Sequence, residues 1–232
     1  QVSPRFRKLL ADYINSLPVT WLPAGSTWSY FTDAAGLGAS DLVEGHASWS
    51  TANWKHSDFN DAAWSTGPAQ FAYGEADEAT VLPFGGVASN VWVTSYFRRE
   101  FTVTGAAEVS SLIVNIKRDD GAIVYINGRE AARSNMTNGT VYTGTTRAPA
   151  GAPDDGRGFN AIPVPASLLN EGRNVIAVEI HQASASSSDV SFDLELKAAG
   201  GGTGGMTNAE RMTRIGEAFH LISLSPEFAA QK

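Results

Sequence analysis

Residues 112–133 read LIVNIKRDDGAIVYINGREAAR, and this stretch decides the fold. Apolar side chains occupy alternate positions from Leu112 to Ile116, and a second alternating run extends from Ala122 to Ile126. Asp119-Asp120-Gly121 separates the two runs, and Asn127-Gly128 follows the second. A period of two is typical of a half-buried strand, and Asn-Gly favours a tight hairpin turn. The stretch predicts two strands joined by a tight turn at 119–121, with a further hairpin at 127–128.

Three more segments carry the same signal. Residues 91–103 form an apolar and aromatic run that Arg98 interrupts with charge, and residues 174–181 and 190–197 alternate cleanly. Short loops between strands that each bury one face indicate an antiparallel sandwich. We therefore expect a mainly β protein, an antiparallel β-sandwich. Arg98 has two readings, a bidentate pair with a carboxylate beneath it or a contact with a ligand's hydroxyls, and the structural pair is the more common of the two.

Composition narrows the classes of function. The 232-residue chain carries a formal charge of −7, so neither a nucleic-acid backbone nor an anionic membrane is an expected partner. The absence of cysteine excludes disulfides, thiol catalysis and thiolate metal sites. No apolar run approaches the roughly 18 residues that span a bilayer. The start QVSPRF contains no signal-peptide hydrophobic region, so we expect either a removed signal or a piece of a longer protein.

Both ends of the chain read as amphipathic helices. Residues 3–17 have Ser3 as a cap and Pro4 in the first turn, and a capping box at 207–210 opens a second helix that restarts after a kink at 225–227. Residues 198–205, AAGGGTGG, have the composition of a flexible linker. The predicted organisation is an N-terminal helix (1–18), a sandwich (19–197), a linker (198–205) and a helical tail (206–232). Each helix needs a partner for its apolar stripe: the other helix, the sandwich or another chain.

Two loop regions attract functional hypotheses. Asp58 and Asp61 lie in an aromatic, turn-rich segment, where capping of local amides is favoured over calcium binding. Residues 134–160 form a long polar excursion, and a loop of this length is usually functional or partly mobile.

Asp119 and Asp120 are adjacent and would point to opposite sides of a strand, which suits a turn better than a catalytic pair. No nucleophile elbow, phosphate-binding glycine loop or His-rich metal signature is present, and we predict no catalytic residues.

A binding function needs aromatic rings that stack on sugar C–H faces and polar groups that bond hydroxyls. The chain has six tryptophans, more than packing of a modest β domain requires. Each candidate also has a structural alternative, as core, turn or buried pair. The ligand-binding candidates by loop position are Trp49, Trp54, Tyr73, Arg98, Asp120, Asn127, Arg133, Asn135 and His181. Asp189, at the end of the serine-rich loop 186–189, is a further candidate and the one metal ligand that we predict.

The strings RDDGAIVYINGREAARSNM, SLLNEGRNVIAVEIHQASASSSDVSFDLEL, DFNDAAWSTGPAQFAYG and SYFRREFTV together resemble a galactose-binding-domain-like jelly roll. More loosely, they are similar to the sugar-binding β-sandwich at the front of family 2 glycoside hydrolases. The resemblance covers about residues 21–197. It implies a module of large secreted bacterial proteins, whose relatives include carbohydrate binders, cell-adhesion modules and inert spacers. It also implies a structural calcium in many relatives.

These observations favour a non-catalytic, secreted or cell-surface module that contacts a glycan or a cell-surface polysaccharide. The alternative is a structural subunit that self-associates through residues 3–17 and 207–231 to build an oligomer or a surface filament.

Overall fold

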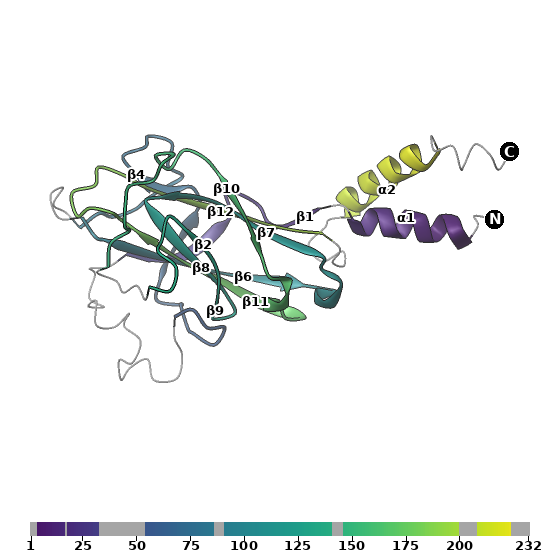
Figure 1. The fold of residues 1–232 in the computed structure, drawn as a ribbon, viewed down its shortest axis with the longest axis horizontal. Helices are drawn as coiled ribbons and strands as arrows, with labels where there is room; N and C mark the ends of the chain where they lie inside the picture. The colour runs from purple at the N-terminus through teal and green to yellow at the C-terminus, as the bar shows by residue number, and fades with distance from the viewer. Residues whose placement is uncertain are drawn as a thin grey trace.

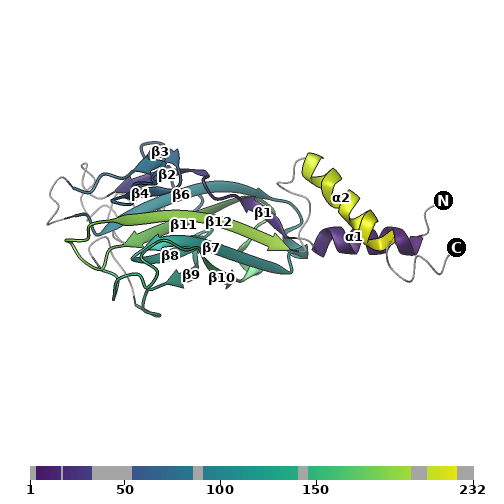
Figure 2. The same ribbon diagram turned by 90° about the horizontal axis from the view of Figure 1, so that it is seen from above.

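The computed structural model describes residues 4–16, 18–32, 54–85, 91–140, 146–199 and 208–223. Two sheets pack face to face, and two helices lie together beyond one end of them (Figure 1). The view from above shows the same arrangement, with the helices crossing each other clear of the strands (Figure 2). Trp49, Thr207 and the predicted restart at 225–227 lie outside the described residues.

The first sheet has six strands. Its path runs β10 (Asn160–Val164), β7 (Ser111–Asp119), β12 (Val190–Ala199), β4 (Phe71–Tyr73) and β5 (Thr80–Val81), and β1 (Val19–Leu22) also pairs with β12. Every pair is antiparallel except β4 with β5. The long central strands β7 and β12 follow from the alternating runs that begin at Leu112 and Val190.

The second sheet is antiparallel throughout. Its order is β3 (Ser65–Pro68), β2 (Thr27–Thr32), β6 (Thr94–Val103), β11 (Gly172–His181), β8 (Gly121–Ile126) and β9 (Arg129–Ser134). Two such sheets confirm the predicted β-sandwich. Its membership of the galactose-binding-like jelly rolls stays a prediction.

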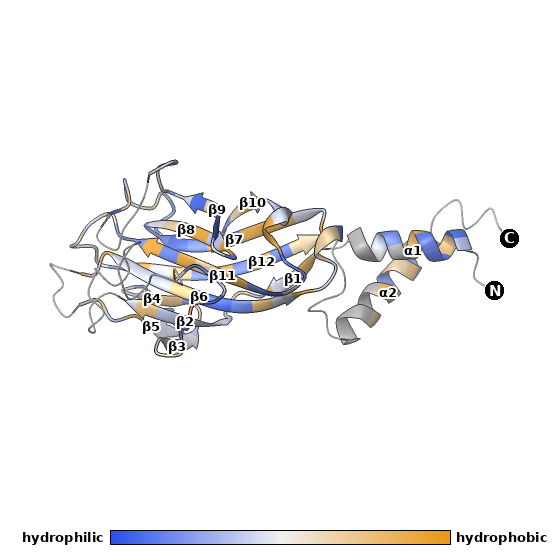
Figure 3. Ribbon diagram, turned by 90° about the horizontal axis from the view of Figure 1, so that it is seen from below, coloured by the Kyte–Doolittle hydropathy of each residue, from blue (hydrophilic) through white to orange (hydrophobic). Residues whose placement is uncertain are grey.

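The main core fills the space between the sheets. Phe71, Phe97 and Phe192 are fully buried there, and the rings of Phe97 and Phe192 lie 4.1 Å apart. Colouring by hydropathy shows hydrophobic and hydrophilic residues alternating along several strands (Figure 3). Alternation therefore sends every second side chain into the core, as a half-buried strand requires.

The predicted tight hairpin at 119–121 is wrong. β7 and β8 belong to different sheets, so Asp119-Asp120-Gly121 is a corner at which the chain crosses from one sheet to the other. Glycine suits this corner because a Cβ at Gly121 would lie 2.3 Å from Sδ of Met136. The second hairpin is confirmed: β8 pairs with β9, and Asn127 and Gly128 have φ angles of 52° and 78°, which a type I′ turn needs.

The helices α1 (Pro4–Ser16) and α2 (Asn208–Ser223) pack on each other, with the rings of Phe6 and Phe219 5.6 Å apart. Short 3₁₀ turns at Ala106–Glu108 and Ala166–Leu168 lie at the same end of the sandwich (Figure 1). Neither described helix combines the length and apolar character needed to cross a membrane.

Candidate functional site

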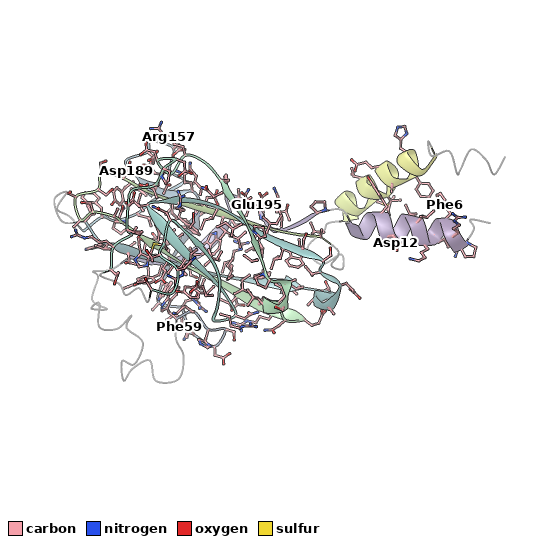
Figure 4. The ribbon with its side chains drawn as sticks, viewed as in Figure 1. Phe6, Asp12, Phe59, Arg157, Asp189 and Glu195 are labelled. Atoms are coloured by element: carbon pink, nitrogen blue, oxygen red, sulfur yellow. The ribbon has the colours of Figure 1, made fainter. Side chains whose placement is uncertain are left out.

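The predicted binding residues lie mainly in two places. One is the outer face of the second sheet, and the other is the end of the sandwich remote from the helices, which we call the loop end. Figure 4 shows both: Phe59 lies outside the second sheet, and Asp189 lies at the loop end.

Residues 54–64 cover the outer face of the second sheet. Trp54 is buried against two tyrosines of that face, with its ring 4.9 Å from that of Tyr96 and 5.8 Å from that of Tyr125. Trp64 packs beside Trp54 and Phe59. The tryptophan candidate Trp54 is therefore part of a second hydrophobic cluster, which is the structural alternative foreseen for it.

Arg98 fastens this covering segment to the sheet. Its side chain is 2% exposed and donates to the carbonyl oxygens of Trp54, His56 and Phe59. Its Nε also lies 3.4 Å from a carboxylate oxygen of Asp61. Burial lowers the pKa of Arg98, and the charge of Asp61 opposes this shift. Arg98 therefore makes the structural pair rather than a contact with open solvent, and the Asp61 carboxylate serves this pair instead of the predicted cap.

His181 belongs to a buried polar network on the same face. Tyr125 donates to Oε1 of Glu179 over 2.6 Å, and Oε2 of Glu179 lies 3.3 Å from Nε2 of His181. Nδ1 of His181 lies 2.8 Å from the carbonyl oxygen of Thr146. Burial, followed by the charge of Glu179, raises the pKa of Tyr125.

Asn127 supports its own turn. Its amide group donates to the carbonyl oxygen of Leu168 and to Oδ1 of Asn174, and its Oδ1 accepts from the backbone N–H of Val175. Two of these bonds join the hairpin to the start of β11, and the bond to Leu168 joins it to the 3₁₀ turn before that strand. Asn127 therefore serves the turn, the structural alternative predicted for it.

Arg133 folds back on its own neighbourhood. Its guanidinium pairs with Glu130 and donates to the carbonyl oxygens of Thr137 and Thr140. The long loop that begins after β9 is thereby tied to the edge of the second sheet.

Asp120 and Asn135 hold loops together at the corner between the sheets. The carboxylate of Asp120 accepts from the backbone N–H groups of Ala152 and Ala183, at 2.9 and 2.7 Å. Asn135 donates to the carbonyl oxygens of Asp120 and Ala150. Asp120 therefore joins Ala152 to the loop after β11, and Asn135 joins the segment after β9 to Asp120 and Ala150.

The loop end carries partly exposed aromatic rings, which we call the aromatic patch: Tyr73, Phe84 and Trp92. The rings of Tyr73 and Phe84 lie 5.6 Å apart, and Phe84 is 40% exposed. The backbone N–H of Trp92 donates to the carbonyl oxygen of Phe84, and a Cβ at Gly85 would lie 2.7 Å from Nε1 of Trp92. The absence of a side chain at Gly85 therefore lets the indole lie against the backbone beside Phe84.

Polar groups adjoin the aromatic patch. Gln182 is 2% exposed, and its Nε2 donates to the hydroxyl of Tyr73 and to the carbonyl oxygen of Asp189. Among the described residues, its Oε1 has no hydrogen-bond partner. Burial raises the pKa of Tyr73 to about 12, the bond from Gln182 opposes this shift, and the charge of Asp189 adds to it. The Tyr73 hydroxyl thus stays protonated and retains its hydrogen as a donor.

Acidic side chains gather behind the patch. Burial, followed by the neighbouring charges of Asp120 and Asp189, raises the pKa of Asp119 to about 8. The carboxylate of Asp189 accepts from the hydroxyl of Ser187 over 3.3 Å. Within the described parts of the chain, no three acidic or histidine side chains come together in a way that could hold a metal ion. The calcium site at Asp189 stays a prediction, because calcium also takes backbone carbonyl and other oxygen ligands.

Among the described candidates, the structure brings Tyr73 and Asp189 together, has the charge of Asp120 acting on Tyr73, and places the others elsewhere. Sequence reasoning missed Phe84, Trp92 and Gln182. The sequence does carry a signal for Phe84 and Trp92. They flank a Gly-containing loop that follows an acidic stretch, and an aromatic side chain beside such a loop is not buried by a strand of its own. Gln182 gave no signal, since its partners are 109 and 7 residues away.

Comparisons with known proteins find similarity among solved structures and nowhere else. No protein-family model matches the chain, and a search of curated proteins finds no match. Among solved structures, a β-glucuronidase of Bacteroides uniformis is 16% identical with a TM-score of 0.45, covering 78% of this chain and 18% of that protein. A β-glucuronidase of an uncultured Clostridium is 13% identical (TM-score 0.44; 79% and 29% covered), and a β-glycosidase of Bacteroides vulgatus is 15% identical (TM-score 0.42; 79% and 20% covered). The chain thus spans less than a third of each of these proteins.

Proposed function

We propose that this chain is a non-catalytic carbohydrate-binding module that meets its glycan with the aromatic patch at the loop end. The single observation that carries the proposal is Phe84, an aromatic side chain left 40% exposed beside Tyr73. An exposed ring next to fixed polar groups is what a sugar requires, because its C–H face stacks on the ring while its hydroxyls find donors and acceptors.

The polar partners are fixed before any ligand arrives. Gln182 holds the Tyr73 hydroxyl at 3.0 Å, so the phenol's position is set and its hydrogen is free to point outward. The serine hydroxyls of the loop 186–189 lie at the same end. Rigid donors lower the entropic cost of binding.

A non-catalytic role is supported by how the buried acids are engaged. Asp120 accepts from two loop amides, and Glu179 is held between Tyr125 and His181. These contacts connect elements of the fold, so both carboxylates stabilise the structure. The secreted or cell-surface location is proposed from the resemblance of residues 21–197 to modules of exported bacterial proteins.

A glycan array with the purified full chain tests the proposal. We expect binding to at least one glycan class, and loss of that binding in the variant Phe84→Ala/Trp92→Ala. Phe159→Ala is the matched control, because Phe159 is 44% exposed and precedes β10, on the opposite edge of the same sheet from β4. Silence across the array, or equal loss in the control, would contradict the proposal.

Self-association through the terminal helices is the second candidate function. It is favoured by the exposed apolar side chains of α1 and α2: Leu9 is 43% exposed, Met212 67% and Phe219 45%. Apolar groups of this size on a helix pair favour association with another apolar surface. Light scattering on the full chain and on a chain that ends at residue 197 tests it. A mass of one subunit for both proteins would exclude assembly through the tail.

A further inference from the structure

We infer that the aromatic patch selects glycans that carry free amino groups and discriminates against uronic-acid glycans. The inference rests on the proposed function, because it names the ligand class of that same patch. It follows from the acidic side chains that border the rings and from the scarcity of cations able to neutralise them.

Two carboxylates stand directly beside the patch. Glu75 follows Tyr73 by two residues, with Gly74 between them. Gly74 lies close to the loop before β12: a Cβ on Gly74 would be 2.5 Å from the carbonyl oxygen of Ser188 and 3.2 Å from Cα of Asp189. Glycine at 74 therefore lets the segment that carries Glu75 lie against the loop that carries Asp189, and the charge of Asp189 acts on Glu75. Asp189 is also the residue whose carbonyl oxygen holds the Gln182 amide against Tyr73.

The cations nearby already have partners. Lys117 lies 3.6 Å from Asp77 and 2.5 Å from Oε1 of Gln70, and Arg157 pairs with Asp155. Within the part of the chain that the structure describes, the carboxylates of Glu75 and Asp189 have no ion pair. Lys117 offsets the charge of Glu75 only in part, so a ligand at the patch meets net negative charge.

The pKa shifts of the groups around the patch are consistent with negative charge at this place. Burial, followed by the charges of Asp189, Asp155 and Asp77, raises the pKa of Glu75, and the charge of Lys117 opposes this shift. The charge of Asp189 acts in the same direction on Tyr73 and on Asp119. A buried acceptor supplies a second feature of a binding place, since the Gln182 amide that supports Tyr73 leaves its Oε1 without a partner among the described residues.

Partly exposed charge pairs are weak, so the preference is moderate. Each carboxylate is expected to favour a protonated amine over the matching neutral group by about two- to fivefold. A uronate would be disfavoured to a similar extent, and salt would weaken both effects because it screens exposed charges.

Titration calorimetry on the full chain tests the inference with three probes of equal length: oligomers of glucosamine, of N-acetylglucosamine and of galacturonic acid. We expect the amine oligomer to bind most tightly and the uronate most weakly. Glu75→Gln and, independently, Asp189→Asn should reduce the preference for the amine while binding of the N-acetylated oligomer persists. Asp12→Asn, an exposed acid on α1, is the matched control.

Equal affinity for all three oligomers, tighter binding of the uronate, or an amine preference that survives both substitutions would overturn the inference while leaving the proposed function intact. Absence of binding by every oligomer and throughout the glycan array would overturn the proposed function itself.

Discussion

Replacing Arg98 with methionine should detach residues 54–64 from the outer face of the second sheet. The guanidinium serves four acceptors, the carbonyl oxygens of Trp54, His56 and Phe59 and the carboxylate of Asp61. It also lies over the Phe59 ring, 5.0 Å from its centroid. Methionine keeps the apolar stem and removes the charge and all donors. At about 1 kcal/mol for each lost bond, the substitution should lower the free energy of unfolding by ~4 kcal/mol.

Urea denaturation followed by tryptophan fluorescence measures this loss, because Trp54 and Trp64 belong to this segment and are buried in its cluster with Tyr96 and Tyr125. For a chain of this size the melting temperature should fall by about 8–16 °C. Arg157→Met is the matched control, since the Arg157 side chain is 76% exposed and its pair with Asp155 should contribute less than ~1 kcal/mol. A loss below ~1 kcal/mol for Arg98→Met would refute the reasoning that Arg98 fastens the segment.

Three further predictions follow from other parts of the molecule. Phe84→Ala should weaken glycan binding about fivefold in calorimetry. At 40% exposure about 80 Å² of Phe84 faces solvent, and a glycan that covers half of this area gains ~1 kcal/mol of binding free energy. The control Phe159→Ala should bind the glycan as the wild type does. The pKa of Asp119 is 3.8 when the side chain is exposed and about 8 in the fold, so the free energy of unfolding should fall by at least ~1 kcal/mol as the pH rises from about 4 through 8. In Asp119→Asn the urea midpoint should depend less on pH over that range. A variant whose midpoint depends on pH as strongly as that of the wild type would contradict this prediction. Gly121→Ala should lower the free energy of unfolding by about 1–3 kcal/mol, because the new Cβ would lie 2.3 Å from Sδ of Met136. The control Gly216→Ala, on the open face of α2, should not destabilise the protein. Equal melting temperatures for the two variants would argue against the tight corner at Gly121.

The strands could be predicted because their signal is local. Alternation in 112–116, 122–126, 174–181 and 190–197 reports burial of one face, and each of these runs lies in an observed strand. The pairing of strands is not local. Residues 119–121 look like a hairpin turn in sequence, yet β7 pairs with β10 and β12 while β8 pairs with β9 and β11.

The candidate site was only partly predictable for the same reason. Tyr73 was identified by its position next to a glycine turn, but its partner Gln182 comes from the far end of β11. Trp54 and Arg98 looked like binding residues because sequence does not reveal that residues 54–64 fold over the sheet and bury both. Exposure, which separates Phe84 from Trp54, is a property of the tertiary structure.

The location of the glycan on the full chain tests the central claim most directly. Chemical-shift mapping by NMR during titration with a bound glycan should move the signals of Tyr73, Phe84, Trp92 and the Gln182 side-chain amide, and leave those of Tyr125 and Glu179 in place. Shifts confined to the outer face of the second sheet or to the terminal helices would contradict the claim that the loop end is where this protein meets its ligand.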